Sequence, residues 1–142
     1  MAILHEDVQA SVERHLQGEL SDSVAWAGAD FNTEDLTAWV ELFPLNETRI
    51  NADPGVDQGE LLYQVSCWAK TGTAQETTKK AAEMVSEVKA ALFDQDIPIR
   101  ATTGGTITGY LTGLRYQVDR VPTEITTLMH RAVTWGAILK TA

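Results

Sequence analysis

Leu61-Leu62-Tyr63-Gln64-Val65-Ser66-Cys67-Trp68-Ala69 is the stretch that decides the fold class, because it alternates like a strand and leads quickly into a helix. One side of the alternation is mainly apolar: Leu61, Tyr63, Val65, Cys67 and Ala69. The other side mixes polar and aromatic residues: Leu62, Gln64, Ser66 and Trp68. A repeat of two is typical of a strand with one face on a core.

Two segments predict amphipathic helices. The first repeats Leu4, Val8, Val12 and Leu16 every fourth residue and reaches Gly18 near its end. The second runs from Ala74 to Phe93, with Thr71 or Thr73 as the residue that caps its start. Its apolar stripe comprises Ala81, Met84, Val85, Val88, Ala91 and Leu92. A helix with one apolar stripe needs a partner surface, and a sheet supplies it.

The remaining strands are predicted from alternation on both sides of the second helix. Leu36–Leu45 forms one strand, which Pro44 is expected to end, and Ser23–Gly28 is a candidate short first strand. Tyr110–Asp119 and Thr127–Leu139 form the last two. Ile99–Gly109, which contains Gly104-Gly105, is expected to be irregular; the glycine pair lacks the spacing of a phosphate-binding loop.

These elements predict an α+β fold in a single domain over residues 1–142, since that length suits one domain. Consecutive strands with short links favour a single mainly antiparallel sheet of four to five strands with two helices packed on one face. The longest polar stretch, Asn46–Gly59, contains the turn signal Asp53-Pro54-Gly55 and is expected to be a long loop. A loop of that length is often functional, although an ordinary hairpin loop is the alternative.

The charge balance restricts the classes of partner. There are 11 Lys+Arg against 20 Asp+Glu, which gives a net charge of −9 at pH 7. Wrapping nucleic acid or binding an anionic membrane requires an excess of Lys and Arg, so neither is expected. The N-terminus lacks the basic region and long apolar core of a signal peptide, and no apolar run reaches the length of a membrane span. The single cysteine, Cys67, is expected to be a small buried residue and not a nucleophile.

No catalytic, cofactor or metal site is expected. The three histidines, His5, His15 and His130, do not have the spacing of metal ligands. His130 lies in a strand of mixed polarity, which favours a structural or interface role. Acidic pairs such as Asp53 with Asp57 lack the remaining ligands of a calcium loop.

Large side chains occupy the strand faces that the helices cannot cover. Trp39 and Phe43 alternate with polar residues, Trp68 alternates with Gln64 and Ser66, and Arg115 lies between Gly113 and Gln117. Aromatic residues and Arg are enriched where protein subunits meet. The sequence therefore predicts a subunit interface that includes Trp39, Phe43, Trp68 and Arg115, on a sheet face otherwise open to solvent.

The order of these elements resembles the tail terminator, or tail completion, proteins of long-tailed bacteriophages and the minor tail and neck proteins that share their fold. The features that carry the resemblance are the N-terminal helix, the strand Ala38–Leu42, the long polar loop, and Tyr63–Ala69 running into the helix with Ala81–Leu92. The resemblance implies a non-enzymatic virion component, made in the host cytoplasm and located at the head-proximal end of the tail.

The resemblance also implies partners. A homo-oligomer, expected as a hexameric ring, would bind the last ring of tail tube protein, stop tube growth and offer a surface to the head–tail connector or neck protein. DNA would only pass through the lumen, where negative charge limits sticking. The polar loop, with Arg49, Asp53 and Asp57, would dock on the tube. Two alternatives stay open: a neck or head–tail joining protein of the same fold, and a small α+β ligand-binding or enzyme subunit.

Overall fold

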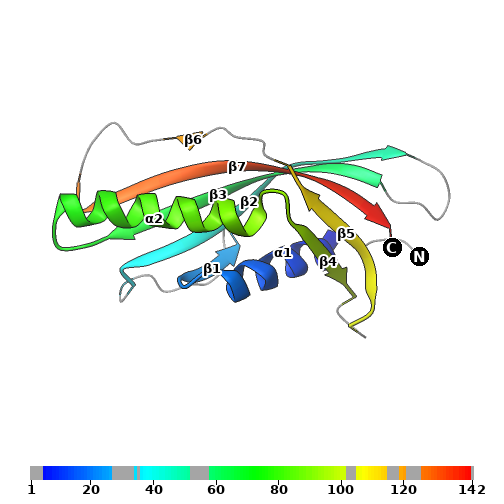
Figure 1. Cartoon of the computed structure of the whole chain (residues 1–142), viewed down its shortest axis with the longest axis horizontal. Helices are drawn as coiled ribbons and strands as arrows, with labels where there is room; N and C mark the ends of the chain where they lie inside the picture. Colours follow the sequence, from blue (N-terminus) through cyan, green and yellow to red (C-terminus); the bar gives the residue numbers. More distant parts are fainter. Residues whose placement is uncertain are drawn as a thin grey trace.

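The computed structural model describes residues 5–26, 34, 36–51, 58–101, 105–114, 119–120 and 126–141. The fold is α+β, as predicted (Figure 1). In chain order its elements are α1 (His5–Glu19), β1 (Ser23–Trp26), β2 (Ala38–Asn51), β3 (Gln58–Lys70), α2 (Ala74–Leu92), β4 (Asp96–Arg100), β5 (Ile107–Gly113), β6 (Asp119–Arg120) and β7 (Leu128–Thr141).

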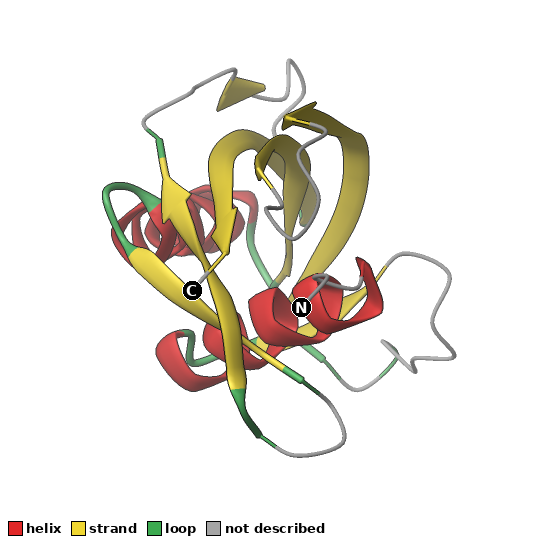
Figure 2. Ribbon diagram, turned by 90° about the vertical axis from the view of Figure 1, so that its right-hand side faces the viewer, coloured by secondary structure: helices red, strands yellow, loops and turns green. Residues whose placement is uncertain are grey.

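The strands form one curled, mixed sheet. Six strands follow the order β1-β2-β3-β7-β5-β4, and the short β6 pairs with β7 beside them. β1 runs parallel to β2, whereas the other pairs are antiparallel. Figure 2 shows how strongly the sheet bends around the helices. The predicted count of four to five strands is wrong, because the segment expected to be irregular, Ile99–Gly109, contributes the end of β4 and the start of β5.

The core lies between the helices and one face of the sheet. The apolar stripe predicted for the second helix is buried, and Val8, Val12 and Leu16 of α1 join the same cluster. Tyr63 and Trp135 are fully buried across the β3–β7 pair, with ring centroids 5.9 Å apart. Cys67 is also fully buried in this cluster, as expected. Burial of this apolar area is the main force that holds the helices on the sheet.

The ends of α2 are fixed by specific hydrogen bonds. Thr73 caps the helix start, because its hydroxyl accepts a bond from the Glu76 amide at 3.2 Å. Thr77, in the first turn, is fully buried, and its hydroxyl reaches the carbonyls of Thr73 at 2.8 Å and Thr127 at 3.3 Å. These bonds tie the start of α2 to the chain that enters β7.

The polar segment Asn46–Gly59 differs from its prediction. Both of its ends are strand: β2 continues to Asn51 and β3 starts at Gln58, so the two form a long hairpin. The ladder shifts register between Pro44 and Asn46, which identifies a bulge and not the predicted strand end. Among the described residues β1 pairs with β2 only as far as Leu42. Within them, Pro44 therefore lies where β2 has a partner strand on one side only, and proline is tolerated there.

Candidate functional site

The face of the sheet opposite the core is the region to which the sequence assigned function. We define the outer face as the side chains of β2, β3 and β7 that alternate with the core residues. They are Trp39, Glu41 and Phe43 on β2, Leu62, Gln64, Ser66 and Trp68 on β3, and Leu128, His130, Ala132 and Thr134 on β7. The period of two found in all three strands places them there.

Three aromatic rings form a stack across this face. Trp39 and Trp68 are register partners with ring centroids 6.0 Å apart and planes 9° from parallel. Trp68 stacks in turn on its partner His130, at 4.3 Å and 13°. The Trp39 indole Nε1 donates a hydrogen bond to the Glu41 carboxylate at 3.3 Å. Stacked aromatic pairs across adjacent strands add stability beyond their burial.

The stack makes part of the outer face less accessible than the sequence predicted. Trp39 is only 7% exposed, so the expectation that it lies open to solvent is wrong. Ser66 and Ala132 are also buried, although they are outer-face residues. Phe43 and Trp68 remain half-buried. The physical reason is that neighbouring rings cover one another. Which rings are neighbours depends on the register between strands, and the sequence of a single strand does not reveal it.

Burial also changes the electrostatics of the stack. Desolvation lowers the pKa of His130 below 6.5, although the nearby Glu41 carboxylate acts in the opposite direction. The ring nitrogens Nε1 of Trp68 and Nε2 of His130 are buried and have no hydrogen-bond partner in the part of the chain that the structure describes. The stack is therefore a place where a positive charge is disfavoured.

The other predicted site residues are placed only in part. Phe43 shares the outer face with Trp39 and Trp68, but its register partner is Gln64, so it does not belong to the ring stack. Arg49 lies in β2 near the end of the hairpin, paired with Gly59. Asp53, Asp57 and Arg115 fall outside the described residues.

Among the described residues, sequence reasoning missed four exposed apolar side chains. Leu45, Tyr110, Leu114 and Leu128 are 50%, 41%, 38% and 47% exposed. Leu128 is an outer-face residue at the start of β7, two positions before His130. The alternation predicted for Thr127–Leu139 could have identified it, because it placed Leu128 and His130 on one side.

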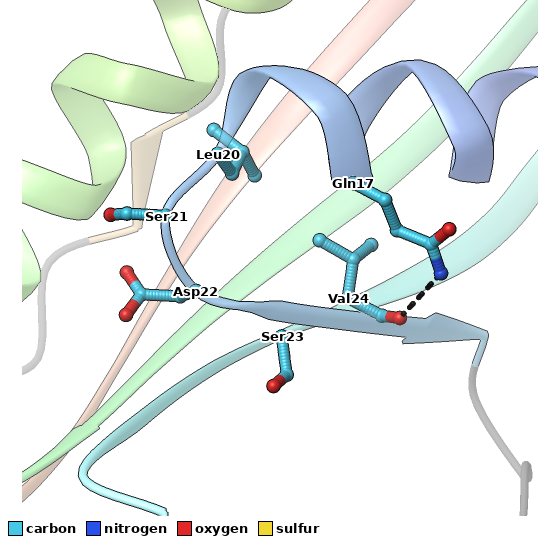
Figure 3. A pocket seen from close by; sticks show the side chains of 6 residues that line it. All are labelled: Gln17, Leu20, Ser21, Asp22, Ser23 and Val24. Atoms are coloured by element: carbon cyan, nitrogen blue, oxygen red, sulfur yellow. Dashed lines mark hydrogen bonds between the residues drawn. The ribbon is translucent and has the colours of Figure 1, made fainter.

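A surface hollow lies at the turn between α1 and β1 (Figure 3). Its polar side chains tie elements together: Asp22 forms an ion pair with Lys80 at 3.2 Å, and Gln17 donates to the Val24 carbonyl at 3.5 Å. Among the described residues there is no group of three His, Cys, Asp or Glu that could hold a metal ion. Within the same residues, neither helix is long and apolar enough to cross a membrane.

Comparison with known proteins gives a likeness in fold. No family model matches the chain. No curated protein matches it either. A solved structure whose name states no function matches with a TM-score of 0.64 at 14% identity, over 99% of this chain and 97% of the other. The sheath/tube terminator of an extracellular contractile injection system, called PVC and solved in its extended state, matches with a TM-score of 0.57 at 12% identity. That match covers 100% of this chain and 58% of the terminator. The chain therefore has a tail-terminator-like fold.

Proposed function

We propose that this chain is a tail terminator: a structural protein whose copies form a ring on the end of a tail tube and stop its growth. The observation that carries the proposal is the likeness in fold to a sheath/tube terminator along the whole of this chain. The chain spans 58% of that protein, so what the rest of that protein adds is not transferred. The proposed location is the tail of a virion or of a related tail-like particle.

The outer face supports the proposal as a contact surface between subunits. Phe43 and Trp68 are half-buried and Leu128 is about half exposed, so three apolar side chains of the outer face remain in contact with solvent. A neighbouring subunit that covered these side chains would remove apolar area from water. Trp39 contributes indirectly, because its ring stacks on that of Trp68.

The β2–β3 hairpin supports the proposed contact with the tube. Its strands extend past α2 and away from the core in Figure 1. Ladder pairing between β2 and β3 continues to Asn51 and Gln58, so this part of the chain is a hairpin and not the free loop that the sequence predicted. Arg49, Asp53 and Asp57, which the sequence assigned to tube docking, belong to this hairpin or to the residues that join its strands.

The acidic balance agrees with a ring through which DNA passes. A net charge of −9 per chain disfavours binding of nucleic acid to a lumen lined by this protein. No membrane contact and no catalytic step form part of the proposal.

Electron microscopy of particles assembled without this chain tests the proposal. Tubes of uncontrolled length that carry no head would support a terminator, because nothing then stops polymerisation. Tubes of normal length that fail to join heads would instead favour a neck or head–tail joining protein. Normal, complete particles would contradict both.

Size-exclusion chromatography with light scattering tests the ring itself. Addition of the tube protein from the same source should convert the chain into a ring-sized assembly. Phe43→Ser should weaken this assembly by about tenfold, since a half-buried apolar contact is lost. Unchanged thermal unfolding of the isolated variant would show that the fold is intact. A monomer that ignores tube protein and binds small metabolites would favour the ligand-binding alternative.

A further inference from the structure

A row of three side chains lies on the side of the sheet away from the helices. Tyr110 of β5 is the register partner of Pro98 on β4 and of Lys140 on β7. Because Tyr110 alternates with the fully buried Leu111, the row faces away from the core. Tyr110 and Lys140 are exposed, and Pro98 is half-buried. We call Pro98, Tyr110 and Lys140 the β5 row.

The β5 row combines apolar surface with a positive charge. Tyrosine is enriched where proteins meet, because its ring is apolar and its hydroxyl can form a hydrogen bond. Lys140 adds an ammonium group on an apolar stem. The residues opposite Lys140 in the ladder, Gln58 and Tyr110, carry no charge. The row therefore fits a surface that has both apolar groups and an excess of negative charge.

The hollow at the turn between α1 and β1 has the matching composition (Figure 3). Its volume is about 420 Å³. Its lining is mixed, with buried Leu20 and Val24 as the apolar part and Gln17, Ser21, Asp22 and Ser23 as the polar part. An aromatic ring can pack on the apolar part while its hydroxyl reaches the polar part.

The charges beside the hollow complement Lys140. The Asp22 carboxylate pairs with Lys80 at 3.2 Å, and the Ser21 hydroxyl donates to the Glu87 carboxylate at 3.4 Å. Two carboxylates and one ammonium group thus meet beside the hollow, which is an excess of one negative charge among these groups. A positively charged side chain that enters the hollow balances it, and such complementarity favours one mode of docking over others.

The two surfaces lie on opposite sides of the sheet. The hollow adjoins α1, and α1 packs on the core side, whereas the β5 row faces the other way. In the strand order, β1 is one end of the sheet and β5 lies next to the other end. A contact between two different surfaces of the same chain joins copies head to tail, and it gives a ring where the rotation closes.

We propose that the β5 row of one copy enters the hollow at the α1–β1 turn of the next copy. Tyr110 packs on the apolar lining of the hollow, and Lys140 meets the carboxylates of Asp22 and Glu87. This inference rests on the proposed function, since a ring of terminator subunits needs a head-to-tail contact. It adds to the contact proposed at the outer face and specifies the direction in which copies join.

Mixing two complementary variants tests the contact. Tyr110→Ser/Lys140→Ser removes the row and keeps the hollow, whereas Ser23→Arg fills the hollow and keeps the row. In sedimentation equilibrium the wild-type chain should associate beyond a dimer, because each copy carries both surfaces. Each variant alone should show a dissociation constant at least about tenfold higher. An equimolar mixture should form a one-to-one pair and stop there, with a constant within about threefold of wild type.

Matched substitutions outside both surfaces are the controls. Lys79→Ser and Ser86→Arg make the same kinds of change at exposed residues of α2. Both should associate as the wild type does. Circular dichroism spectra of all variants should match that of the wild type, because the changed side chains lie outside the core.

Every other outcome overturns the contact. A wild-type chain that stays monomeric up to concentrations on the order of 1 mM does so. So does either variant that associates alone as the wild type does, a mixture that fails to pair, or a control that loses association. Tube capping has its own readout, since a failed mixture with capping intact would contradict this inference alone. A mixture that pairs, together with normal tube lengths in particles that lack the chain, would contradict the terminator and leave the contact.

Discussion

At the scale of single residues, Gly113 has a strict steric requirement. A Cβ at this position would lie 1.9 Å from the Leu92 carbonyl oxygen and 3.0 Å from the Trp135 indole nitrogen. The same carbonyl ends α2 and accepts a hydrogen bond from Trp135 at 3.3 Å. We expect Gly113→Ala to lower the free energy of unfolding by about 3 kcal/mol, because backbone must move to admit the methyl group. Urea denaturation measures this.

Gly18, within α1, is the matched control. Nothing lies within 4 Å of a Cβ built there. Gly18→Ala should be neutral or stabilising by up to about 1 kcal/mol, because alanine is the better helix former. Equal effects of the two substitutions would contradict the close approach of β5 to the end of α2.

His130 provides a prediction about pH. Desolvation lowers its pKa in the folded chain below 6.5, against the opposing effect of Glu41. The unfolded chain then binds more protons than the folded chain as the pH falls through the ordinary histidine range, so protonation favours unfolding. The stability that depends on neutral His130 is complete well above pH 6.5 and is lost as the pH decreases below it.

His130→Phe isolates this contribution, because phenylalanine can stack on Trp68 but cannot titrate. The difference in unfolding free energy between the wild type and this variant should change between about pH 7 and pH 5, with the wild type losing more. His5 and His15 are present in both chains and cancel. A difference that is flat with pH would show that His130 ionises equally in the folded and unfolded chains.

At the scale of elements, α1 both covers the core and holds the edge strand β4. Ser11 is buried, and its hydroxyl accepts the amide of Arg100 at 3.1 Å. Ser11→Ala should lower the free energy of unfolding by about 1 kcal/mol, because the amide loses its acceptor. Hydrogen exchange should show faster exchange at Arg100 and little change in β3, at the sheet centre.

Gln17→Ala tests whether this effect belongs to the hydrogen bond or to the helix as a whole. The Gln17 side chain is exposed and its bond to Val24 is long, at 3.5 Å. This variant should leave the exchange of Arg100 at the wild-type rate. Accelerated exchange in both variants would mean that α1 loosens as a unit.

The elements that the sequence predicted well are those whose apolar residues repeat regularly within one continuous segment. α2, β3 and β7 show a clear repeat along one segment, and the structure places them within a few residues of the predicted bounds. The ends of the β2–β3 hairpin were missed because Asn46–Asn51 is polar, and its strand form is maintained by ladder hydrogen bonds with β3. The parallel pairing of β1 depends on contacts distant in sequence, which no local repeat reveals.

The candidate site was predictable to the same extent. Alternation correctly placed Trp39, Phe43 and Trp68 on one face of the sheet, since side-chain direction in a strand depends only on the repeat of two. Their exposure was not predictable, because it depends on register across three strands. Trp39, Trp68 and His130 come together only because β2, β3 and β7 align at those positions.

At the scale of the whole molecule, the curled sheet separates in space the two surfaces to which the proposal assigns contacts. The outer face lies on the body of the protein, whereas the β2–β3 hairpin extends past α2 (Figure 1). Contacts between subunits and contacts with a tube can therefore be changed independently. This separation makes the hairpin a direct test of how the proposed terminator meets its tube.

Removal of residues 53–57 from the hairpin should impair capping and preserve the fold. The deletion ends before Gln58, because that residue belongs to β3. The core residues that the structure describes lie outside it, so the free energy of unfolding should change by no more than about 0.5 kcal/mol. Tube length, measured by electron microscopy after assembly with the variant, should become uncontrolled. Glu19→Gln/Glu83→Gln is the control, since it removes two exposed charges from the helices, as the deletion removes two from the hairpin. Normal tube lengths with the deletion variant would show that residues 53–57 do not dock on the tube. Overlong tubes with the control variant would show that net charge alone governs capping.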